Sequence, residues 1–227
     1  MLEHINPLDN PVWYALAGPH RAHAIGRGLA LHYPRDMAPF SAIAEPSAPA
    51  YADLAADLLP QTEARLFRPS EEALPHRWEQ LDAFPMLQMV ATSVPSSSDT
   101  IATTLSAADL PAMMDLVAIA KPGPFGPRTP ELGRYLGVHR DGRLVAMAGE
   151  RLRLPGHVEL SAICVHPDAR GRGHGMTLTL ALMRLALDGG EVPFLHVRPE
   201  NVGAVGLYER LGFRTRRQLV VLWRRPR

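Results

Sequence analysis

The segment with the most evident chemistry is rich in glycine and lies in the last third of the chain, at residues 163–175. Its apolar start predicts a strand, and the three alternating glycines at its end predict the opening of a long apolar helix. The first N–H groups of a helix lack backbone partners and carry a partial positive charge, which suits a phosphate or pyrophosphate. Arg170 and Arg172 add positive charge. Taken alone, the segment indicates either an anion cradle or a turn used only for packing.

The spacing of this turn matches neither of two common phosphate loops. A second motif accompanies the turn. The turn lacks the Lys-Ser or Lys-Thr pair of a triphosphate loop, and its G-x-G-x-G order lacks the final x-x-G of the dinucleotide fingerprint. The second motif spans residues 201–213, where Asn201 is placed to cap a helix and Gly212 to end it. The helical repeat turns Tyr208 toward the inside of the protein.

Together with Val165, His166 and Pro167, the two motifs resemble the GNAT superfamily of acyl-CoA-dependent N-acyltransferases. The turn follows the family's order of Arg or Gln, two residues, Gly, one residue, and Gly or Ala, and residues 201–213 follow N-x-x-A-x-x-x-Y-E-x-x-G-F. The resemblance covers residues 100–227, and this C-terminal module is most similar to the subgroup related to glycine N-acyltransferases. It does not explain residues 1–99.

The resemblance implies how acetyl-CoA binds, as a co-substrate and without a metal. The pantetheine arm and the thioester pair with the backbone of a strand that is splayed from its neighbour, the pyrophosphate lies on the amides of the turn, and the start of the second helix flanks the pantetheine. A strand amide polarises the thioester carbonyl as a small oxyanion hole. The implied coenzyme-binding residues are Ile163, Cys164, Val165, Arg170, Gly171, Arg172, Gly173, His174, Gly175, Met176, Asn201 and Ala204.

Acyl transfer needs a proton for the departing thiolate and an uncharged amine to attack. Tyr208 matches the general acid that the family uses; the alternative is a core aromatic whose hydroxyl finds a local partner. Glu159 lies in a half-buried strand, where a carboxylate needs a role or a partner. It is therefore either the general base, acting through a water, or one half of a salt bridge to a neighbouring arginine.

The remaining histidines and the cysteine have simpler interpretations. His166 and His174 lie at the turn and are expected to shape it, and His196 is expected to be a satisfied core histidine. Cys164 has no triad around it, so a small buried residue is favoured over a covalent acyl-enzyme. His20 and His23 are three residues apart but lack a third metal ligand, so a surface position is expected for both.

The second half of the chain has a regular order of elements that would position these residues. A strand candidate at 100–105 precedes a helix capped by Ser106, and a meander follows over 134–140, 144–154 and 157–165. A helix at 170–187, a strand at 194–197, a helix at 201–211 and a strand around 219–223 complete it. This order predicts an α/β fold, a GNAT-like mixed β-sheet flanked by helices, over residues 100–227.

Residues 1–99 predict an N-terminal α/β extension of unknown role, and a degenerate half-copy of the same fold is one interpretation of it. Asn10 and Pro11 indicate a helix start, and residues 11–31 are expected to be helical with a break at Gly18. A helix at 50–59, strands at 65–68 and 86–93, and a linker at 95–99 follow.

Composition bounds the class of protein. The chain has 227 residues, of which 46% are hydrophobic, a formal net charge of +1 and a single cysteine. These values favour a globular protein of a reducing cytoplasm, and the start of the sequence does not look like a signal peptide. They give no reason to expect nucleic acid or a membrane as partner. Six arginines between residues 214 and 227 are expected on a solvated edge strand; attraction of coenzyme phosphates or of an acidic acceptor is the alternative.

The sequence thus predicts transfer of an acyl group, most simply acetyl, from acetyl-CoA to an amine by direct attack in a ternary complex. The acceptor would be a small-molecule or peptide amine, and the proline-rich loop at 121–130 would help to select it. A non-catalytic acyl-CoA-binding regulatory module is the main alternative. A nucleic-acid-binding protein that uses the terminal arginines is disfavoured by the balanced charge.

Overall fold

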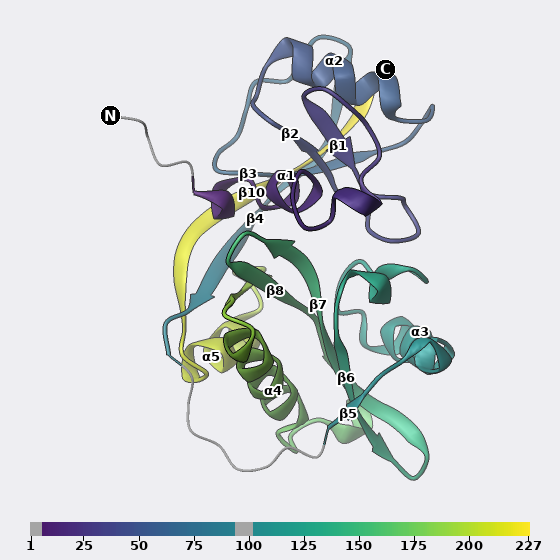
Figure 1. Cartoon of the computed structure of the whole chain (residues 1–227), viewed down its shortest axis with the longest axis vertical. Helices are drawn as coiled ribbons and strands as arrows, with labels where there is room; N and C mark the ends of the chain where they lie inside the picture. Colours follow the sequence, from purple (N-terminus) through teal and green to yellow (C-terminus); the bar gives the residue numbers. More distant parts are fainter. Residues whose placement is uncertain (1–5, 94–101) are drawn as a thin grey trace.

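A mixed sheet of eight strands lies at the centre of the protein, which the computed structural model describes over residues 6–93 and 102–227 (Figure 1). In spatial order the strands are β3 (Ala64–Arg68), β10 (Phe213–Pro226), β4 (Trp78–Ala91), β9 (Val192–Val197), β8 (His157–Val165), β7 (Arg143–Leu154), β6 (Tyr135–Arg140) and β5 (Thr103–Thr104). A separate pair, β1 (Ala30–His32) and β2 (Ser41–Ile43), is antiparallel. The helices are α1 (Pro11–Leu16), α2 (Ala48–Asp57), α3 (Leu110–Ala120), α4 (His174–Asp188) and α5 (Val202–Arg210).

The predicted meander is confirmed in β6, β7 and β8. Asp141 and Gly142 form the first turn with backbone φ angles of 51° and 75°, which a tight hairpin requires at both central positions. Gly156, with φ of 74°, lies in the second turn. The strand β8 contains a bulge: Ala162 has φ of 51°, and the pairing with β7 shifts between Met147 and Gly149.

The strands β8 and β9 are parallel and part after three residue pairs. Their register ends with Glu159 opposite Phe194. Beyond this point β8 continues along β7, while Phe194–Val197 of β9 pair with β4. The expected splayed strand is therefore present, and the bulge at Ala162 lies on its splayed part.

The helices cover both faces of the sheet. Figure 1 shows α4 and α5 on one side of β6–β8 and α3 on the other. Leu178, Leu182 and Tyr208 belong to the buried cluster on the α4 and α5 side, and Met113 and Leu116 of α3 belong to a separate cluster with Cys164. The helix α3 is preceded by the predicted capping box, in which Ser106 and Asp109 bond reciprocally.

The N-terminal part of the chain contributes strands to the same sheet. Strand β4 lies between β9 and β10, and β3 pairs with β10. The expectation of an edge strand at the C-terminus is therefore wrong, because β10 has a neighbour on each side. The predicted linker at 95–99 lies outside the described residues, and the division at residue 99 stays a prediction, as does the half-copy.

The predicted long N-terminal helix is also wrong. The helix α1 ends at Leu16, and β1 begins at Ala30. Asn10 occupies the cap position, but its side-chain amide donates to the carbonyl of Ile43, 2.8 Å away, and so ties α1 to β2. Apolar side chains here pack against sheet residues such as Leu152 and Phe194.

Candidate active site

The glycine-rich turn connects β8 to α4 and leaves open space at its glycines. Gly171 and Gly173 have φ of 75° and 79°, and Gly173 is the N-cap residue of α4. A Cβ atom at Gly171 would meet no heavy atom within 4 Å, and one at Gly173 would meet only Met176, at 4.0 Å. Packing therefore does not require these glycines. They allow the left-handed backbone and keep the first N–H groups of α4 uncovered.

Polar groups at the turn favour an anion. Arg170 and Arg172 are exposed. Nε2 of His174 is buried and has no hydrogen-bond partner within the described chain. Burial, and then the nearby Arg140 and Arg172, lower the pKa of His174. His166 shapes the turn as expected, because its Nδ1 accepts from the backbone N–H of Asp168 at 3.3 Å.

The two predicted motifs meet in space. A Cβ atom at Gly175 would lie 3.7 Å from the side chain of Val165 and 4.0 Å from that of Leu207. The end of β8, the first turn of α4 and the helix α5 therefore touch. The Asn201 side chain caps α5 as predicted, since its oxygen accepts from the N–H of Ala204 at 3.2 Å.

Exposed apolar side chains flank this meeting point. Met176, in the first turn of α4, is 42% exposed, and Val202, at the start of α5, is 74% exposed. Both offer apolar contact to a ligand that lies on the turn.

Ile163, Cys164 and Val165 follow the bulge in β8. Ile163 and Val165 are half-buried and pack on the α4 and α5 side, whereas Cys164 is buried on the α3 side. Burial raises the pKa of Cys164 to about 12, so its thiol is not a nucleophile near neutral pH. This agrees with the expected small buried residue.

Tyr208 faces inward as predicted. It is 9% exposed, and its ring meets that of Phe213 edge to face at 6.0 Å. Burial raises the pKa of Tyr208 to about 12. The phenol therefore keeps its proton at neutral pH and is able to donate it in a hydrogen bond.

Glu159 does not have the surroundings of a general base. Its carboxylate is fully buried and accepts two hydrogen bonds from the Arg151 guanidinium, at 2.7 and 2.8 Å. Its Oε1 also lies 2.7 Å from Nδ1 of His196. Burial alone would raise the pKa of Glu159, but Arg151 and His196 outweigh burial and hold it well below the usual range. The structure shows the salt bridge that was the alternative for Glu159, and its role as general base stays a prediction that these surroundings do not favour.

His196 has a partner at each nitrogen. Its Nε2 lies 3.2 Å from the side-chain nitrogen of Gln88, which also donates to the carbonyl of Leu8. Its Nδ1 faces Glu159, so His196 is a satisfied core histidine, as expected. The surface position expected for His20 is wrong, because His20 is buried and bonds the hydroxyl of Tyr33 at 2.8 Å.

The loop at 121–130 rests on the N-terminal segment. The Thr129 hydroxyl donates to the carbonyl of Met37 at 2.6 Å, and the N–H of Arg128 donates to the carbonyl of Asp36 at 3.0 Å. The sequence carried no signal for these contacts, which join residues about ninety positions apart. They hold the loop on the α3 side of the sheet. The ring of Phe125, which belongs to this loop, meets the ring of Tyr135 edge to face.

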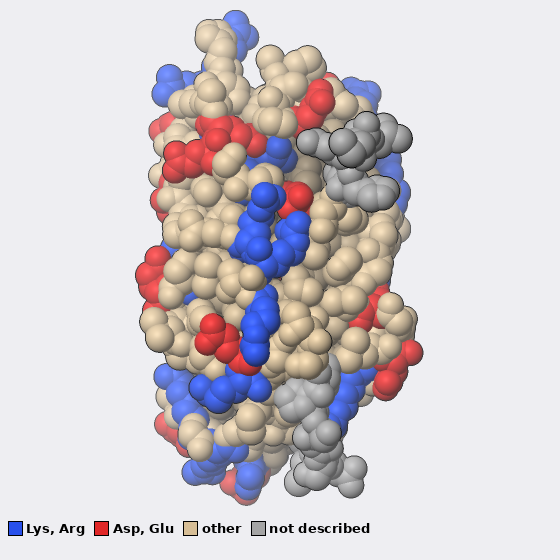
Figure 2. Space-filling view, turned by 90° about the vertical axis from the view of Figure 1, so that its left-hand side faces the viewer, with Lys and Arg blue, Asp and Glu red and all other residues tan. Residues whose placement is uncertain are grey.

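The C-terminal arginines are largely paired. Arg216 and Arg217 both bond Asp9, and Arg225 bonds Glu79. Arg224 is buried. Figure 2 shows basic side chains in a line down the side of the molecule that carries β10, with acidic side chains beside them.

Two further observations concern the described residues only. Over residues 6–93 and 102–227, no three or more His, Cys, Asp and Glu side chains group as they would around a metal ion. No helix in these ranges is long and apolar enough to cross a bilayer.

Comparison with known proteins decides the family. The sequence profile of the FR47-like protein family matches residues 135–222. The crystal structure of a protein from Novosphingobium aromaticivorans, assigned to the acetyltransferases of the GNAT family, shares 36% sequence identity. The two superpose with a TM-score of 0.90 over 98% of this chain and 99% of the other. The chain belongs to the GNAT family.

Two further proteins resemble the chain over less of its length or at lower identity. A mycothiol acetyltransferase from Geodermatophilus obscurus is 43% identical over 70 residues, which are 30% of this chain. The match spans only 22% of that relative's length. A GCN5-related N-acetyltransferase from Kribbella flavida shares the fold, with a TM-score of 0.61 at 20% identity over 95% of this chain and 94% of the other.

Proposed function

We propose that this GNAT protein transfers the acetyl group of acetyl-CoA to an amine by direct attack in a ternary complex. The observation that carries the proposal is the parting of β8 and β9 next to the open glycine turn of α4. One elongated ligand can fill both places. In the coenzyme, the pantetheine arm would enter between β8 and β9, and the pyrophosphate would lie on the turn.

The residues for binding the coenzyme are those that the family motifs imply. The amides of residues 170–176 would hold the pyrophosphate, since the space at Gly171 and Gly173 is open and a helix N-terminus favours anions. His174 would find there the partner that its buried nitrogen lacks. The backbone of Ile163, Cys164 and Val165 would pair with the pantetheine arm. Asn201 and Ala204 would flank that arm from the start of α5.

The bulge in β8 supports polarisation of the thioester. A bulge leaves one residue of the strand out of the ladder, so a backbone N–H there is available to a carbonyl oxygen. A fixed donor of this kind stabilises the charge that develops during attack. Backbone donors near Ala162 and Ile163 would therefore act as the oxyanion hole.

Tyr208 would assist the departing thiolate. A phenol whose pKa is about 12 is protonated at neutral pH, but it is a weaker acid than a thiol, whose pKa is about 8.5. Full proton transfer to the thiolate would be uphill. The hydroxyl is therefore suited to donate a hydrogen bond to the sulfur as the carbon–sulfur bond breaks. Glu159 has no proton-transfer role in this scheme. The proton that the amine nitrogen loses on attack would go to the departing thiolate, so that the products are the amide and the free thiol of the coenzyme.

Several finer assignments remain part of the proposal. The C-terminal module would belong with the glycine N-acyltransferase-like subgroup, and the reaction would take place in the cytoplasm, in keeping with one buried, unpaired cysteine. The acceptor would be a small-molecule or peptide amine rather than nucleic acid. The name of the mycothiol enzyme does not identify the acceptor, because the match covers so little of it.

A thermal-shift experiment separates this proposal from the alternatives. Acetyl-CoA at 100 times its dissociation constant should stabilise the folded protein by about 2.7 kcal/mol. Release of free thiol with one member of an amine panel would then distinguish an enzyme from a non-catalytic acyl-CoA-binding module. If no acyl-CoA shifts the unfolding temperature, both the enzyme and the module are excluded.

A further inference from the structure

Tyr135 lies across the sheet in a way that only a glycine neighbour allows. It begins β6 opposite Gly149 of β7, and Gly149 in turn lies opposite Ser161 of β8. A Cβ atom on Gly149 would come within 2.2, 2.3 and 2.5 Å of three carbon atoms of the Tyr135 ring. The ring therefore rests directly on the backbone of β7, and its hydroxyl end is directed toward β8.

The hydroxyl of Tyr135 is buried without a partner. Tyr135 is 2% exposed, and its oxygen makes no hydrogen bond within the described residues. Leaving a buried hydroxyl unpaired is unfavourable. Tyr135 shares its cluster with Ala162 and Cys164, which lie on the splayed part of β8. The charges of Arg151 and Glu159 are near enough to influence the pKa of the Tyr135 hydroxyl.

Two of the other unpartnered atoms, on Arg65 and Trp223, lie far from this strand. The guanidinium of Arg65 lies 3.9 Å from the centre of the Trp223 ring, and both residues have an unpaired buried nitrogen. They face each other between β3 and β10, at the far end of the sheet. Tyr135 instead faces the strand at which the proposed thioester would bind.

The loop at 121–130 covers Tyr135 on its outer side. The Phe125 ring stands edge to face on the Tyr135 ring, with 5.8 Å between their centres. Phe125 is itself half-buried, while Thr129 and Arg128 fix the loop to Met37 and Asp36. For an acceptor to reach the hydroxyl from the α3 side of the sheet, the Phe125 side chain would have to move.

We propose that the Tyr135 hydroxyl binds the acceptor amine, accepting an N–H from its nitrogen and leaving the nitrogen lone pair directed at the thioester carbonyl. The inference rests on the proposed acyl transfer. Because the cluster around the ring is apolar, the acceptor would be a primary amine with apolar carbon atoms next to the nitrogen. Burial raises the pKa of Tyr135 far above the usual range, so the hydroxyl positions the amine and does not act as its base.

The test compares Tyr135→Phe with Tyr51→Phe. The Tyr51 hydroxyl is also buried, but it donates to Glu72 at 3.0 Å and accepts from Arg224. Initial rates would be measured with acetyl-CoA and the best amine from a panel of primary alkylamines, aralkylamines and polyamines, together with unfolding temperatures. Tyr135→Phe should raise KM for the amine by about 3- to 10-fold, the range for one lost hydrogen bond. It should leave KM for acetyl-CoA unchanged and should not lower the unfolding temperature.

The control variant should do the opposite. Tyr51→Phe removes a hydroxyl with two partners, so the unfolding temperature should fall by about 2–4 °C while both KM values stay the same. An unchanged KM for the amine in Tyr135→Phe, with acetyl-CoA binding intact, would overturn the inference and leave the proposed function standing. So would a fall in unfolding temperature like that of Tyr51→Phe, which would reveal a structural partner even without a known acceptor. Failure of the wild-type protein to bind acetyl-CoA would instead refute the function, and the inference with it.

Discussion

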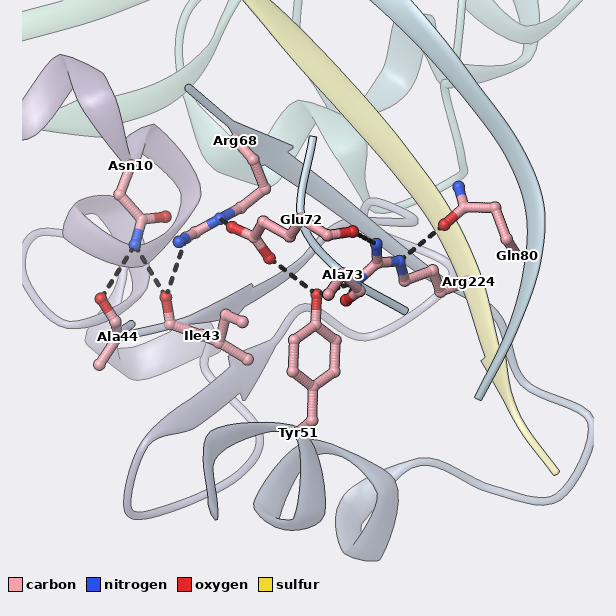
Figure 3. Close-up of polar contacts among 9 residues, drawn as sticks. All are labelled: Asn10, Ile43, Ala44, Tyr51, Arg68, Glu72, Ala73, Gln80 and Arg224. Atoms are coloured by element: carbon pink, nitrogen blue, oxygen red, sulfur yellow. Dashed lines mark hydrogen bonds and ion pairs between the residues drawn. The ribbon is translucent and has the colours of Figure 1, made fainter. Parts of the chain in front are cut away.

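Two of the buried arginine–carboxylate networks in this sheet, one at the β3 end and one near the middle, differ in how a nearby tyrosine is bonded. At the β3–β10–β4 end, Arg224 donates to Gln80 and to the backbone of Glu72, and Tyr51 bonds both Arg224 and Glu72 (Figure 3). At the parting of β8 and β9, Arg151 and His196 both bond Glu159, but the hydroxyl of Tyr135 has no partner within the described residues.

The difference separates structure from function. A network in which each polar group has a partner fixes neighbouring elements, here α2 and β10, and has nothing left to offer a ligand. A buried hydroxyl without a hydrogen-bond partner destabilises the folded protein, and a bound molecule that bonds the hydroxyl removes this penalty. On the α4 and α5 side of the sheet, the turn that opens α4 also leaves N–H groups uncovered, and a ligand can bond these as well.

Gly173→Glu should have the largest effect of the changes that test which of the two regions binds the ligand. It places a carboxylate at the start of α4, where the pyrophosphate is expected, and like charges about 4 Å apart repel strongly. The dissociation constant for acetyl-CoA should rise by about 100-fold or more. Isothermal titration calorimetry would measure it.

Gly156→Glu is the matched control for this change. Gly156 also has positive φ and open space around it, but it lies in the turn between β7 and β8. Both variants should lose similar stability from backbone strain. Equal affinities in the two variants would mean that the turn of α4 is only structural.

Tyr208→Phe tests the hydroxyl on the α5 side of the parting strands. The ring and its packing on Phe213 remain, so KM for acetyl-CoA should change little. Turnover should fall by about 100-fold, the lower end for the loss of one fixed hydrogen-bond donor to a developing charge, because a thiolate leaves fairly well unaided. The loss should shrink with a donor whose thiol is more acidic. If Tyr208→Phe keeps the wild-type turnover when chemistry limits the rate, Tyr208 is a core residue and another group assists the thiolate.

An effect on stability alone, and not on catalysis, is expected from His20, behind the Glu159 network. Burial, and then His23 and Arg153, lower the pKa of His20 to about 4, so the folded protein holds it neutral. The unfolded chain binds a proton near pH 6.5, and therefore stability should be full above pH 6.5 and fall by up to about 3 kcal/mol as the pH drops to about 4. Urea unfolding of wild type and His20→Gln at several pH values would measure it. The slope should be smaller in His20→Gln, and an equal slope would assign it to other groups.

The elements after residue 102 were predictable because their signals are local. Asp141 and Gly142 define a hairpin, Ser106 and Asp109 a capping box, and Asn201 a cap, each within a few residues. The N-terminal segment was harder because its α1 helix and β1–β2 pair are set by burial against distant strands. The place of β4 between β9 and β10 depends on pairing across more than a hundred residues.

The site divides in the same way. The glycine turn and the α5 motif are contiguous in sequence, and the structure places them in contact. The role of Glu159 could not be decided, because its partners Arg151 and His196 come from other strands. Tyr135 was missed entirely. Its one local signal is a glycine, Gly149, in the interior of a strand, where a close neighbour was to be suspected.

The position of β4 also has a consequence for how the chain comes to be folded. During synthesis β4 is complete before any part of β9 or β10 exists, so both of its edges wait for residues that arrive more than a hundred positions later. Sheets closed by such distant pairings form slowly, and their unpaired strands are prone to aggregate. Expression of residues 102–227 alone would leave β9 and β10 without the strand between them. Co-expression of the two pieces should then recover more soluble protein than either piece alone.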